Sequence, residues 1–294
     1  MRNVGLSLVL ALGILGGSVS ALLAEELSLD QVVVALKPDK DPDRMLAERG
    51  ELARILEKNF GKPVEVIVPT SAAVIVEGMR NGTIDLAYVS STEMVNARDN
   101  EAGELLLAGE IDGNPYYKSY WLALKDAPYS KVEDLKGKPI AFSSRTSTSG
   151  FLIPMVDLHA KGLIDESADP ESFFGDGNVS YGIGYVSAVE RVLSGEAEAA
   201  AVSYYVFDED EYLTAEQKAK LKKVTEQGPV PTHVIAVSSK LDEADRAILK
   251  DGLLALRDSG TEINEDIFSA ELIEVDADEH LAPVEAAMKM LNQR

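Results

Sequence analysis

The densest group of side chains able to bind a ligand is the hydroxyl run Thr146-Ser147-Thr148-Ser149, which Gly150 follows. The run stands between a predicted strand, Pro139–Phe142, and a predicted helix that begins near Ser149. The first turn of a helix leaves backbone N–H groups unpaired and carries roughly half a positive charge. Hydroxyls at that place add further donors, so the segment predicts an oxyanion site that needs no lysine.

An ordinary helix cap flanked by loop residues is the simpler interpretation of such a run. Its position favours a binding site, because ligands of open parallel sheets lie in the crevice at the carboxyl ends of the strands. The hydroxyl run leaves such a strand end. We therefore expect Thr146, Ser147, Thr148 and Ser149 to contact a ligand.

Enzyme chemistry is not supported by these residues. A serine hydrolase would need a histidine beside Ser149, yet His159 lies further along the same predicted helix, about 15 Å away at 1.5 Å per residue. His233 and His280 stand in no recognisable catalytic motif. With three histidines and no cysteine, no metal site is predicted. We expect no catalytic residue, no cofactor, and histidines that are structural or exposed.

Tyrosines are grouped near the predicted strand ends. Core packing accounts for most of them, but a tyrosine at a strand end can line a cleft and donate its phenol O–H to a ligand. Tyr117, Tyr185 and Tyr204 are the candidates for such contacts. The whole group consists of Tyr116, Tyr117, Tyr120, Tyr181, Tyr185, Tyr204 and Tyr205.

Alternating strands and helices must position these residues. Apolar runs such as Val32-Val33-Val34 and Val66-Ile67-Val68 alternate with helical patterns over residues 31–89, in β-α-β-α-β order. Continuously apolar strands are expected where helices cover both faces of a parallel sheet. A second α/β unit follows. The strand Tyr120–Lys125 is predicted to lead out of the first unit, and His233–Ser238 to lead back.

Two crossings between the units imply a hinge. The predicted fold is therefore α/β with two lobes, each a mainly parallel sheet flanked by helices, and a ligand cleft between the lobes. Lobe 1 is predicted to span residues 25–125 and 230–294, and lobe 2 residues 126–229. Helices are predicted at Thr214–Lys222, where Thr214 and Gln217 form a capping box, and over lobe 1 at Leu241–Ser259 and Pro283–Gln293.

Residues 1–24 differ from the rest of the chain. Arg2 precedes an uncharged run, Val4–Leu23, and the acidic pair Glu25-Glu26 follows it, as in a secretory signal peptide. A transmembrane anchor is the alternative, because the run approaches the roughly 20 residues that span a bilayer. Glycines and serines within the run, and small residues before Ala24, favour cleavage. We expect an exported protein of the periplasm.

The composition limits the classes of molecule that the protein can bind. A formal net charge of −22 argues against binding to nucleic acid or to an anionic membrane. The absence of cysteine excludes disulfides, thiolate metal sites and a lipid anchor attached to cysteine. We therefore expect a monomer without a lipid anchor that binds a small ligand.

Segments along nearly the whole mature chain carry a resemblance to a known family. The most specific is Ser147-Thr148-Ser149-Gly150-Phe151-Leu152-Ile153-Pro154, a hydroxyl run followed by an aromatic residue and a proline. The others are Asp41-Pro42, Ile84-Asp85-Leu86-Ala87-Tyr88, Tyr117-Lys118-Ser119, Asp134-Leu135-Lys136-Gly137-Lys138, and the Ala188-Val189 helix that ends in Ser194-Gly195. The chain thus resembles the phosphate/phosphite/phosphonate-binding family of ABC-transporter substrate-binding proteins.

This resemblance implies the type II periplasmic binding fold. It also implies capture of a phosphonate, phosphite or phosphate by lobe closure, and delivery to the permease of an ABC importer. Ser147, Thr148 and Ser149 are then the residues that hold the oxyanion, through hydroxyls and helix amides. No enzymatic activity is implied.

The chain departs from the family at three places. Phosphonate binders commonly carry a tyrosine near Ala72, a tyrosine or a glycine-containing stretch near Val89-Ser90, and a histidine near Val186. Ser90 is kept as a candidate ligand contact, and Tyr185 or Arg145 as a replacement for the lost donors, although Arg145 can equally lie outside the cleft. The second hypothesis is therefore a binding protein of the same fold for another small solute, or a ligand-sensing partner of a sensor kinase.

Overall fold

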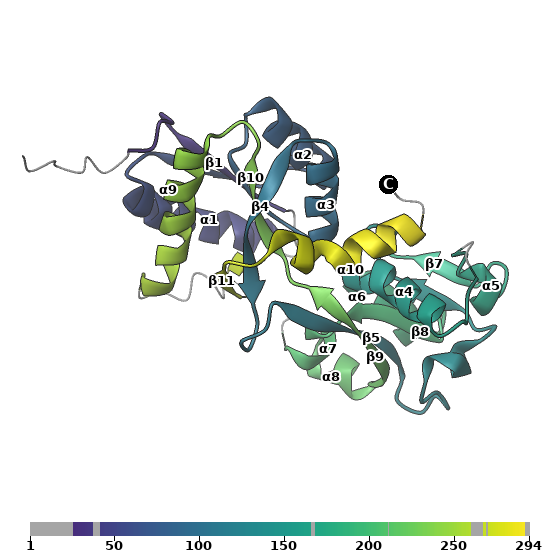
Figure 1. Ribbon diagram of the computed structural model, residues 1–294. Coiled ribbons are helices and arrows are strands. Elements are labelled where there is room, and N and C mark those ends of the chain that lie inside the picture. The colour runs from purple at the N-terminus through teal and green to yellow at the C-terminus, as the bar shows by residue number, and fades with distance from the viewer. Residues whose placement is uncertain are drawn as a thin grey trace, which may run out of the picture.

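The computed structural model describes residues 26–37, 42–165, 168–210, 212–259, 267–268 and 270–291. The predicted signal peptide, residues 1–24, lies outside the described residues. Two β-sheets, each covered by helices, define two lobes that lie next to each other (Figure 1). None of the described helices is long and apolar enough to cross a membrane.

Lobe 1 is built on a six-stranded sheet with the strand order β11-β4-β10-β3-β1-β2. Strand β1 is parallel to β2 and β3, whereas β10 is antiparallel to β3 and β4, and β11 is antiparallel to β4. The strands are β1 (Val32–Leu36), β2 (Val64–Ile67), β3 (Leu86–Val89), β4 (Gly103–Glu110), β10 (Val234–Ser238) and β11 (Glu271–Ile273).

Helices cover both faces of this sheet. Val34 and Leu36 of β1 pack into the core under α1 and α9, while Ala35 packs into the core under α2 and α3. Because neighbouring residues of a strand point to opposite faces, a strand covered on both sides must be apolar throughout. The helices are α1 (Pro42–Phe60), α2 (Ala72–Asn81), α3 (Ser91–Asp99), α9 (Glu243–Leu254) and the 3₁₀ turn η3 (Ala255–Asp258).

Lobe 2 is built on a five-stranded sheet with the order β7-β6-β8-β5-β9. Strand β6 is parallel to β7 and β8, whereas β5 is antiparallel to β8 and β9. The fully buried rings of Trp121, Phe142 and Phe174 meet in its core. The strands are β5 (Tyr116–Leu124), β6 (Ile140–Phe142), β7 (Val179–Tyr181), β8 (Ala199–Ser203) and β9 (Leu221–Pro231).

The helices of lobe 2 are short. The segment η2 is π-helical and runs directly into α4, so that the two form one continuous helix. The helices are the 3₁₀ turn η1 (Val132–Leu135), η2 (Thr148–Leu152), α4 (Ile153–Ala160), α5 (Glu171–Phe174), α6 (Tyr185–Leu193), α7 (Tyr205–Asp208) and α8 (Ala215–Ala219).

The two-lobed α/β fold agrees with the prediction, but both sheets are mixed rather than mainly parallel. The antiparallel strand β10 lies between β3 and β4, and all of its residues are buried. Such a strand is continuously apolar for the same reason as a parallel one, because helices cover both of its faces. An apolar run therefore predicts burial and does not distinguish the two kinds of pairing.

Strand β9 begins inside the region predicted as the helix Thr214–Lys222. The capping box is confirmed, because Thr214 Oγ1 accepts from Gln217 N at 3.2 Å and Gln217 Oε1 from Thr214 N at 2.9 Å. The helix α8, however, ends at Ala219. The next buried residues, Leu221 and Val224, keep a three-residue spacing that a helix also shows, because bulges shift the β5–β9 register.

The chain passes between the lobes first at residues 111–115, between β4 and β5, and again between β9 and β10. The first passage comes earlier than the predicted strand Tyr120–Lys125, because β5 pairs with β8 and β9 in the sheet of lobe 2. Thr232 joins the two passages. Its Oγ1 lies 2.7 Å from the carbonyl oxygen of Gly109 and 3.0 Å from that of Pro115.

The C-terminal helix α10 (Ala277–Met290) lies across the junction of the lobes (Figure 1). It packs against α3 of lobe 1 and against η2, α4 and β9 of lobe 2. It begins earlier than the predicted helix Pro283–Gln293, with Asp276 as its cap, and contains Pro283 in its interior. The division into residues 25–125, 126–229 and 230–294 stays a prediction, and α10 belongs to neither lobe alone.

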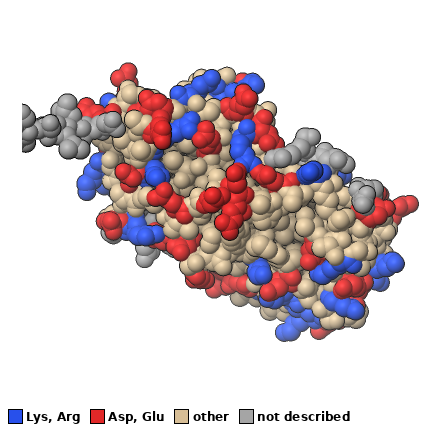
Figure 2. All heavy atoms as spheres, viewed as in Figure 1, with Lys and Arg blue, Asp and Glu red and all other residues tan. Residues whose placement is uncertain are grey.

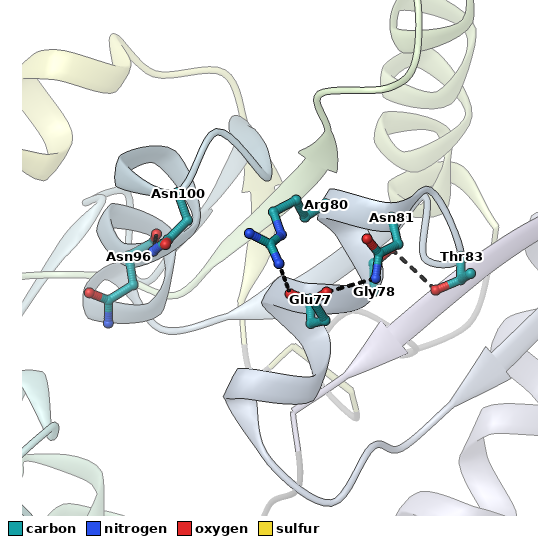
Figure 3. A network of polar contacts seen from close by, with 7 residues as sticks. All are labelled: Glu77, Gly78, Arg80, Asn81, Thr83, Asn96 and Asn100. Atoms are coloured by element: carbon teal, nitrogen blue, oxygen red, sulfur yellow. Dashed lines mark hydrogen bonds and ion pairs between the residues drawn. The ribbon is translucent and has the colours of Figure 1, made fainter.

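Polar contacts close the C-terminal ends of α2 and α3 (Figure 3). Glu77 accepts hydrogen bonds from Arg80 at 2.6 Å and from Asn81 at 2.8 Å, and Asn100 Nδ2 donates to the Asn96 carbonyl at 2.7 Å. Gly82 follows α2 in the left-handed conformation that closes a helix. Both helices therefore end in satisfied polar groups on this side, and their N-terminal ends lie on the opposite side.

Candidate ligand-binding cleft

A cleft of about 690 Å³ opens between the lobes, a size within the range of small-molecule sites. Residues at strand ends and helix starts line it from both sides. Those of lobe 1 are Lys37, Ala72, Ser90, Glu93 and His233. Those of lobe 2 are Tyr117, Ser143, Ser144, Thr146, Ser147, Thr148, Ile183, Gly184, Tyr185, Val186, Ser187, Glu190 and Tyr212.

Several helices begin at the wall of this cleft. Ala72 is the first residue of α2, and Ser90, Ser147 and Gly184 are the N-caps of α3, η2 and α6. A helix start presents unpaired N–H groups and the positive end of the helix dipole. The cleft is therefore suited to an anion without a large number of basic side chains.

The outer surface of the protein has the opposite character. Acidic side chains are spread over both lobes on the face shown in Figure 2, in keeping with the net charge of −22. Surface charges are screened over about 8 Å at physiological ionic strength, whereas donors in the cleft act at contact distance. An acidic surface and an anion site are thus compatible.

The predicted hydroxyl run opens the continuous helix formed by η2 and α4. Ser147 Oγ accepts from Gly150 N at 3.0 Å, and the Ser147 carbonyl accepts from Leu152 N, also at 3.0 Å. This π-helical start is wider than an α-helical one and postpones the first backbone hydrogen bond by one residue. Gly150 is required here, because a Cβ would lie 2.4 Å from Ser143 Oγ. The local fold thus presents hydroxyls and unpaired amides together.

Most of the predicted site residues lie together on the cleft wall, and two lie behind it. Ser149 is fully buried and does not line the cleft. Its Oγ lies 2.8 Å from the Oη of Tyr185, which does line the cleft. Tyr204 lines a neighbouring side pocket. The residues on the wall are Ser90, Tyr117, Thr146, Ser147, Thr148 and Tyr185.

The side pocket has a volume of about 40 Å³ and shares Tyr117, Tyr212 and His233 with the cleft. The ring centroids of Tyr204 and Tyr117 lie 5.7 Å apart. Burial raises the pKa of the Tyr117 phenol well above its usual value, and burial together with the nearby Glu209 carboxylate raises the pKa of Tyr204. Both phenols are therefore neutral at physiological pH and can donate hydrogen bonds.

Lys37 and His233 line the cleft although the sequence interpretation did not select them. Lys37 follows the carboxyl end of β1, His233 precedes β10, and Lys37 Nζ lies 3.1 Å from His233 Nε2. His233 therefore lies on the cleft wall, a place that the sequence interpretation did not predict for a histidine. The strand-end rule that selected Ser147 also applies to Lys37, and would have identified it.

The remaining histidines do not line the cleft. His280 is a buried residue of α10, with Nε2 3.4 Å from the Thr232 carbonyl, and burial lowers its pKa. His159 lies in α4. Among the described residues, no group of three or more His, Asp or Glu side chains is placed to hold a metal ion.

Arg145 lies outside the cleft, with its guanidinium 4.0 Å from the centroid of the Tyr181 ring. The alternative of an exposed Arg145 therefore describes the structure. Ala72 and Val186 line the cleft with apolar side chains at two of the three places where the chain departs from phosphonate binders. Tyr185 lines the cleft next to Val186 in sequence, and its Oη lies 2.8 Å from Ser149 Oγ.

Two α/β lobes that face each other across a polar, anion-suited cleft define the class of periplasmic binding proteins. Solved structures of this class share the fold. PhnD1 from Prochlorococcus marinus, in complex with methylphosphonate, has a TM-score of 0.75 at 20% identity, with 90% of this chain and 99% of that chain covered. XAC2383 from Xanthomonas citri, bound to chloride, has a TM-score of 0.74 at 18% identity, with the same coverage.

Residues 34–281 match the family model described as the periplasmic substrate-binding protein of the phosphonate ABC transporter, and the chain belongs to this family. The phosphate-import protein PhnD of Mycolicibacterium smegmatis is 29% identical over 197 residues, or 66% of this chain. The phosphonates-binding periplasmic protein of Escherichia coli K12 is 32% identical over 117 residues, or 38% of this chain. The matched segments span 60% and 35% of those two relatives.

Family membership confirms the resemblance inferred from the hydroxyl run and its flanking segments. The family consists of substrate-binding proteins, so the prediction that the chain is not an enzyme is confirmed with it. Family membership does not identify the ligand or the roles of individual cleft residues.

Proposed function

We propose that the protein captures a phosphorus oxyanion, namely a phosphonate, phosphite or phosphate, and delivers it to the permease of an ABC importer. The observation that carries this proposal is the position of Thr146, Ser147 and Thr148 on the cleft wall at the start of the continuous helix formed by η2 and α4. Hydroxyl and amide donors there suit the several oxygens of such a ligand.

The roles of the residues follow from their places. Thr146, Ser147 and Thr148 donate from lobe 2, Ser90 and the start of α2 face them from lobe 1, and Tyr117 and Tyr185 add phenol donors. A ligand bridging both walls stabilises the closed arrangement of the lobes, because it contacts both only when they are closed. The closed form is then the one presented to the permease.

Export and assembly complete the proposal. A signal peptide over residues 1–24 would place the protein in the periplasm, where it acts as a monomer without a lipid anchor, nucleic acid or cofactor. Mass spectrometry of the protein recovered from a bacterial periplasm tests this. Cleavage after Ala24 or Ala21 is expected, and retention of the N-terminus in the membrane fraction would show an anchor instead.

Isothermal titration against phosphate, phosphite, methylphosphonate and 2-aminoethylphosphonate tests the ligand. The protein is freed of copurified ligand, and a Thr146→Ala, Ser147→Ala double variant is titrated beside it. Loss of two hydrogen bonds to a charged ligand is expected to weaken binding by roughly 100-fold or more. The matched control is Thr214→Ala, which removes the cap hydroxyl of α8, a helix start that does not line the cleft.

A different solute, or a sensor kinase as partner, is the second candidate function. It is favoured by the apolar side chains of Ala72 and Val186 on the cleft wall, where phosphonate binders commonly carry donors. Binding of none of the four oxyanions would contradict the first proposal and direct the search to other solutes.

A further inference from the structure

The helix start that carries the hydroxyl run lacks one of its backbone donors. In the π-helical segment η2 a carbonyl accepts from the N–H five residues further on, as the Ser147 carbonyl does from Leu152 N at 3.0 Å. By the same rule the Ser149 carbonyl would accept from residue 154. That residue is Pro154, which has no N–H. The Ser149 carbonyl therefore has no donor in the π-helical pattern.

The α-helical pattern does not supply the missing donor. The amide four residues after Ser149 is that of Ile153, and it donates to the Thr148 carbonyl. Pro154 also has no N–H for the carbonyl four residues before it, that of Gly150, and in a regular helix its ring would clash with that oxygen. Pro154 thus leaves two carbonyls of η2 without their helical donors.

Donors from the sheet of lobe 2 bond both carbonyls. Ser119 Oγ, on β5, donates to the Ser149 carbonyl at 2.6 Å. Ser143 N, directly after β6, donates to the Gly150 carbonyl at 3.2 Å. Ser119 and Ser149 are fully buried, so loss of the hydroxyl would leave a buried carbonyl without this partner. The helix start is therefore tied to the sheet by the carbonyls that the proline leaves open.

Gln227 sets the direction of the Ser119 hydroxyl. Gln227 is a buried residue of β9, and its Nε2 lies 2.7 Å from Ser119 Oγ. A serine hydroxyl has one proton, and a carbonyl can only accept, so the proton of Ser119 goes to Ser149. Gln227 must then donate to Ser119. A buried chain of donors thus runs from β9 through β5 to the helix start.

Ser149 connects this chain to the cleft wall. Its Oγ lies 2.8 Å from Tyr185 Oη, and Ser147 Oγ lies 3.3 Å from the same phenol. Ser147 and Tyr185 both line the cleft. The residues of a binding site must be held within about 0.5 Å of their productive positions. A displacement of Ser149 would therefore disturb the groups that contact the ligand.

We propose that Ser119 and Pro154 are positioning residues of the ligand site and act through Ser149. The proline withholds a backbone donor and the serine hydroxyl replaces it, so the hydroxyl run is held on the sheet of lobe 2 as well as by its own helix. Neither residue lines the cleft. This inference rests on the proposed function.

Isothermal titration with methylphosphonate, phosphate and phosphite, together with thermal unfolding, tests the proposal on the protein freed of copurified ligand. Ser119→Ala removes the donor to the Ser149 carbonyl, and affinity should fall roughly fivefold or more. Pro154→Ala supplies an N–H to the same carbonyl. The double variant Ser119→Ala, Pro154→Ala should therefore bind nearly as tightly as Pro154→Ala alone.

Ser238→Ala is the matched control. Ser238 is fully buried on β10, and its Oγ donates to the Met79 carbonyl at 2.7 Å, so this variant loses the same kind of hydrogen bond. Met79 lies in the last turn of α2, at the opposite end from the helix start on the cleft. Ser238→Ala should lower the melting temperature and leave affinity unchanged. A merely structural Ser119 would behave in the same way.

The outcomes separate this inference from the proposed function. Wild-type affinity in Ser119→Ala overturns the positioning role and leaves the oxyanion proposal standing. If Ser119→Ala is too unstable to titrate, binding by the double variant supports the inference, and failure of the double variant to fold overturns it.

Binding of none of the three oxyanions by the wild type overturns the proposed function. The melting temperatures then test the inference, because Pro154→Ala should restore most of the stability that Ser119→Ala loses. Additive losses in the two variants would show that the serine and the proline do not act on one carbonyl.

Discussion

Thr92 of lobe 1 and Thr148 of lobe 2 are joined by a buried hydrogen bond across the junction of the lobes, with their Oγ1 atoms 2.8 Å apart. Thr92 lies in the first turn of α3, and Thr148 is the first residue of η2. Thr148 also lines the cleft. The hydroxyl run is therefore positioned partly by its own helix and partly by a residue of the other lobe.

Thr92→Val is expected to destabilise the protein by about 1–2 kcal/mol, because Thr148 Oγ1 then lies buried without this partner. The double variant Thr92→Val, Thr148→Val should recover part of that loss, since both polar atoms are then removed. Urea denaturation measures both effects. If the loss of unfolding free energy in the double variant equals the sum of the losses in Thr92→Val and Thr148→Val alone, the two hydroxyls are not coupled.

Gly150→Ala is expected to weaken both stability and ligand binding. The added Cβ would lie 2.4 Å from Ser143 Oγ and 2.5 Å from Ser143 Cβ, so η2 or the end of β6 must shift. Thermal unfolding and titration with methylphosphonate report the two effects. The matched control is Gly50→Ala in α1, where a Cβ meets no atom within 4 Å and a gain of roughly 0.5–1 kcal/mol is expected. Wild-type affinity in Gly150→Ala would mean that the π-helical start tolerates displacement.

Most of the fold could be predicted from the apolar pattern. Runs such as Val32–Leu36 are buried on both faces, and an apolar run indicates this burial. The apolar pattern does not indicate the direction of a strand or the position of a bulge. The predicted helix Thr214–Lys222 therefore overlapped the start of β9 at Leu221, because the pairing of β9 with β5, and the extra residues that β9 inserts into it, are set by the fold.

The candidate site was predictable where a local pattern carries the chemistry. The hydroxyl run lies in one segment, and its helix start is recognisable from the sequence. Lys37 and His233 are separated by 196 positions and meet through the sheet order, which places β10 beside β3 and β3 beside β1. Ser149 and Tyr204 were selected with their neighbours, although the fold turns both away from the cleft.

His280→Met is expected to reduce the loss of stability on acidification. Burial lowers the pKa of His280 below its ordinary value of 6.5, so the unfolded chain binds a proton more readily than the folded one. The free energy of unfolding therefore decreases as the pH falls below about 6.5, where His280 of the unfolded chain binds a proton. The decrease continues until the pH reaches the lower pKa of His280 in the folded protein. Urea midpoints across this range measure it, with His159→Gln as control. Parallel profiles of stability against pH for wild type and His280→Met would contradict a contribution of His280 to the loss of stability in acid.

Ile183→Ser is expected to weaken ligand binding without destabilising the ligand-free protein. Ile183 is fully exposed, yet it lines the cleft from the loop before α6, so closure of the lobes removes it from water. Partial burial of an isoleucine contributes about 1 kcal/mol, which corresponds to roughly a fivefold loss of affinity for methylphosphonate. Leu124→Ser is the matched control, because Leu124 is also an exposed apolar residue of lobe 2 but lies off the cleft. Unchanged affinity in Ile183→Ser would show that closure leaves this loop in solvent.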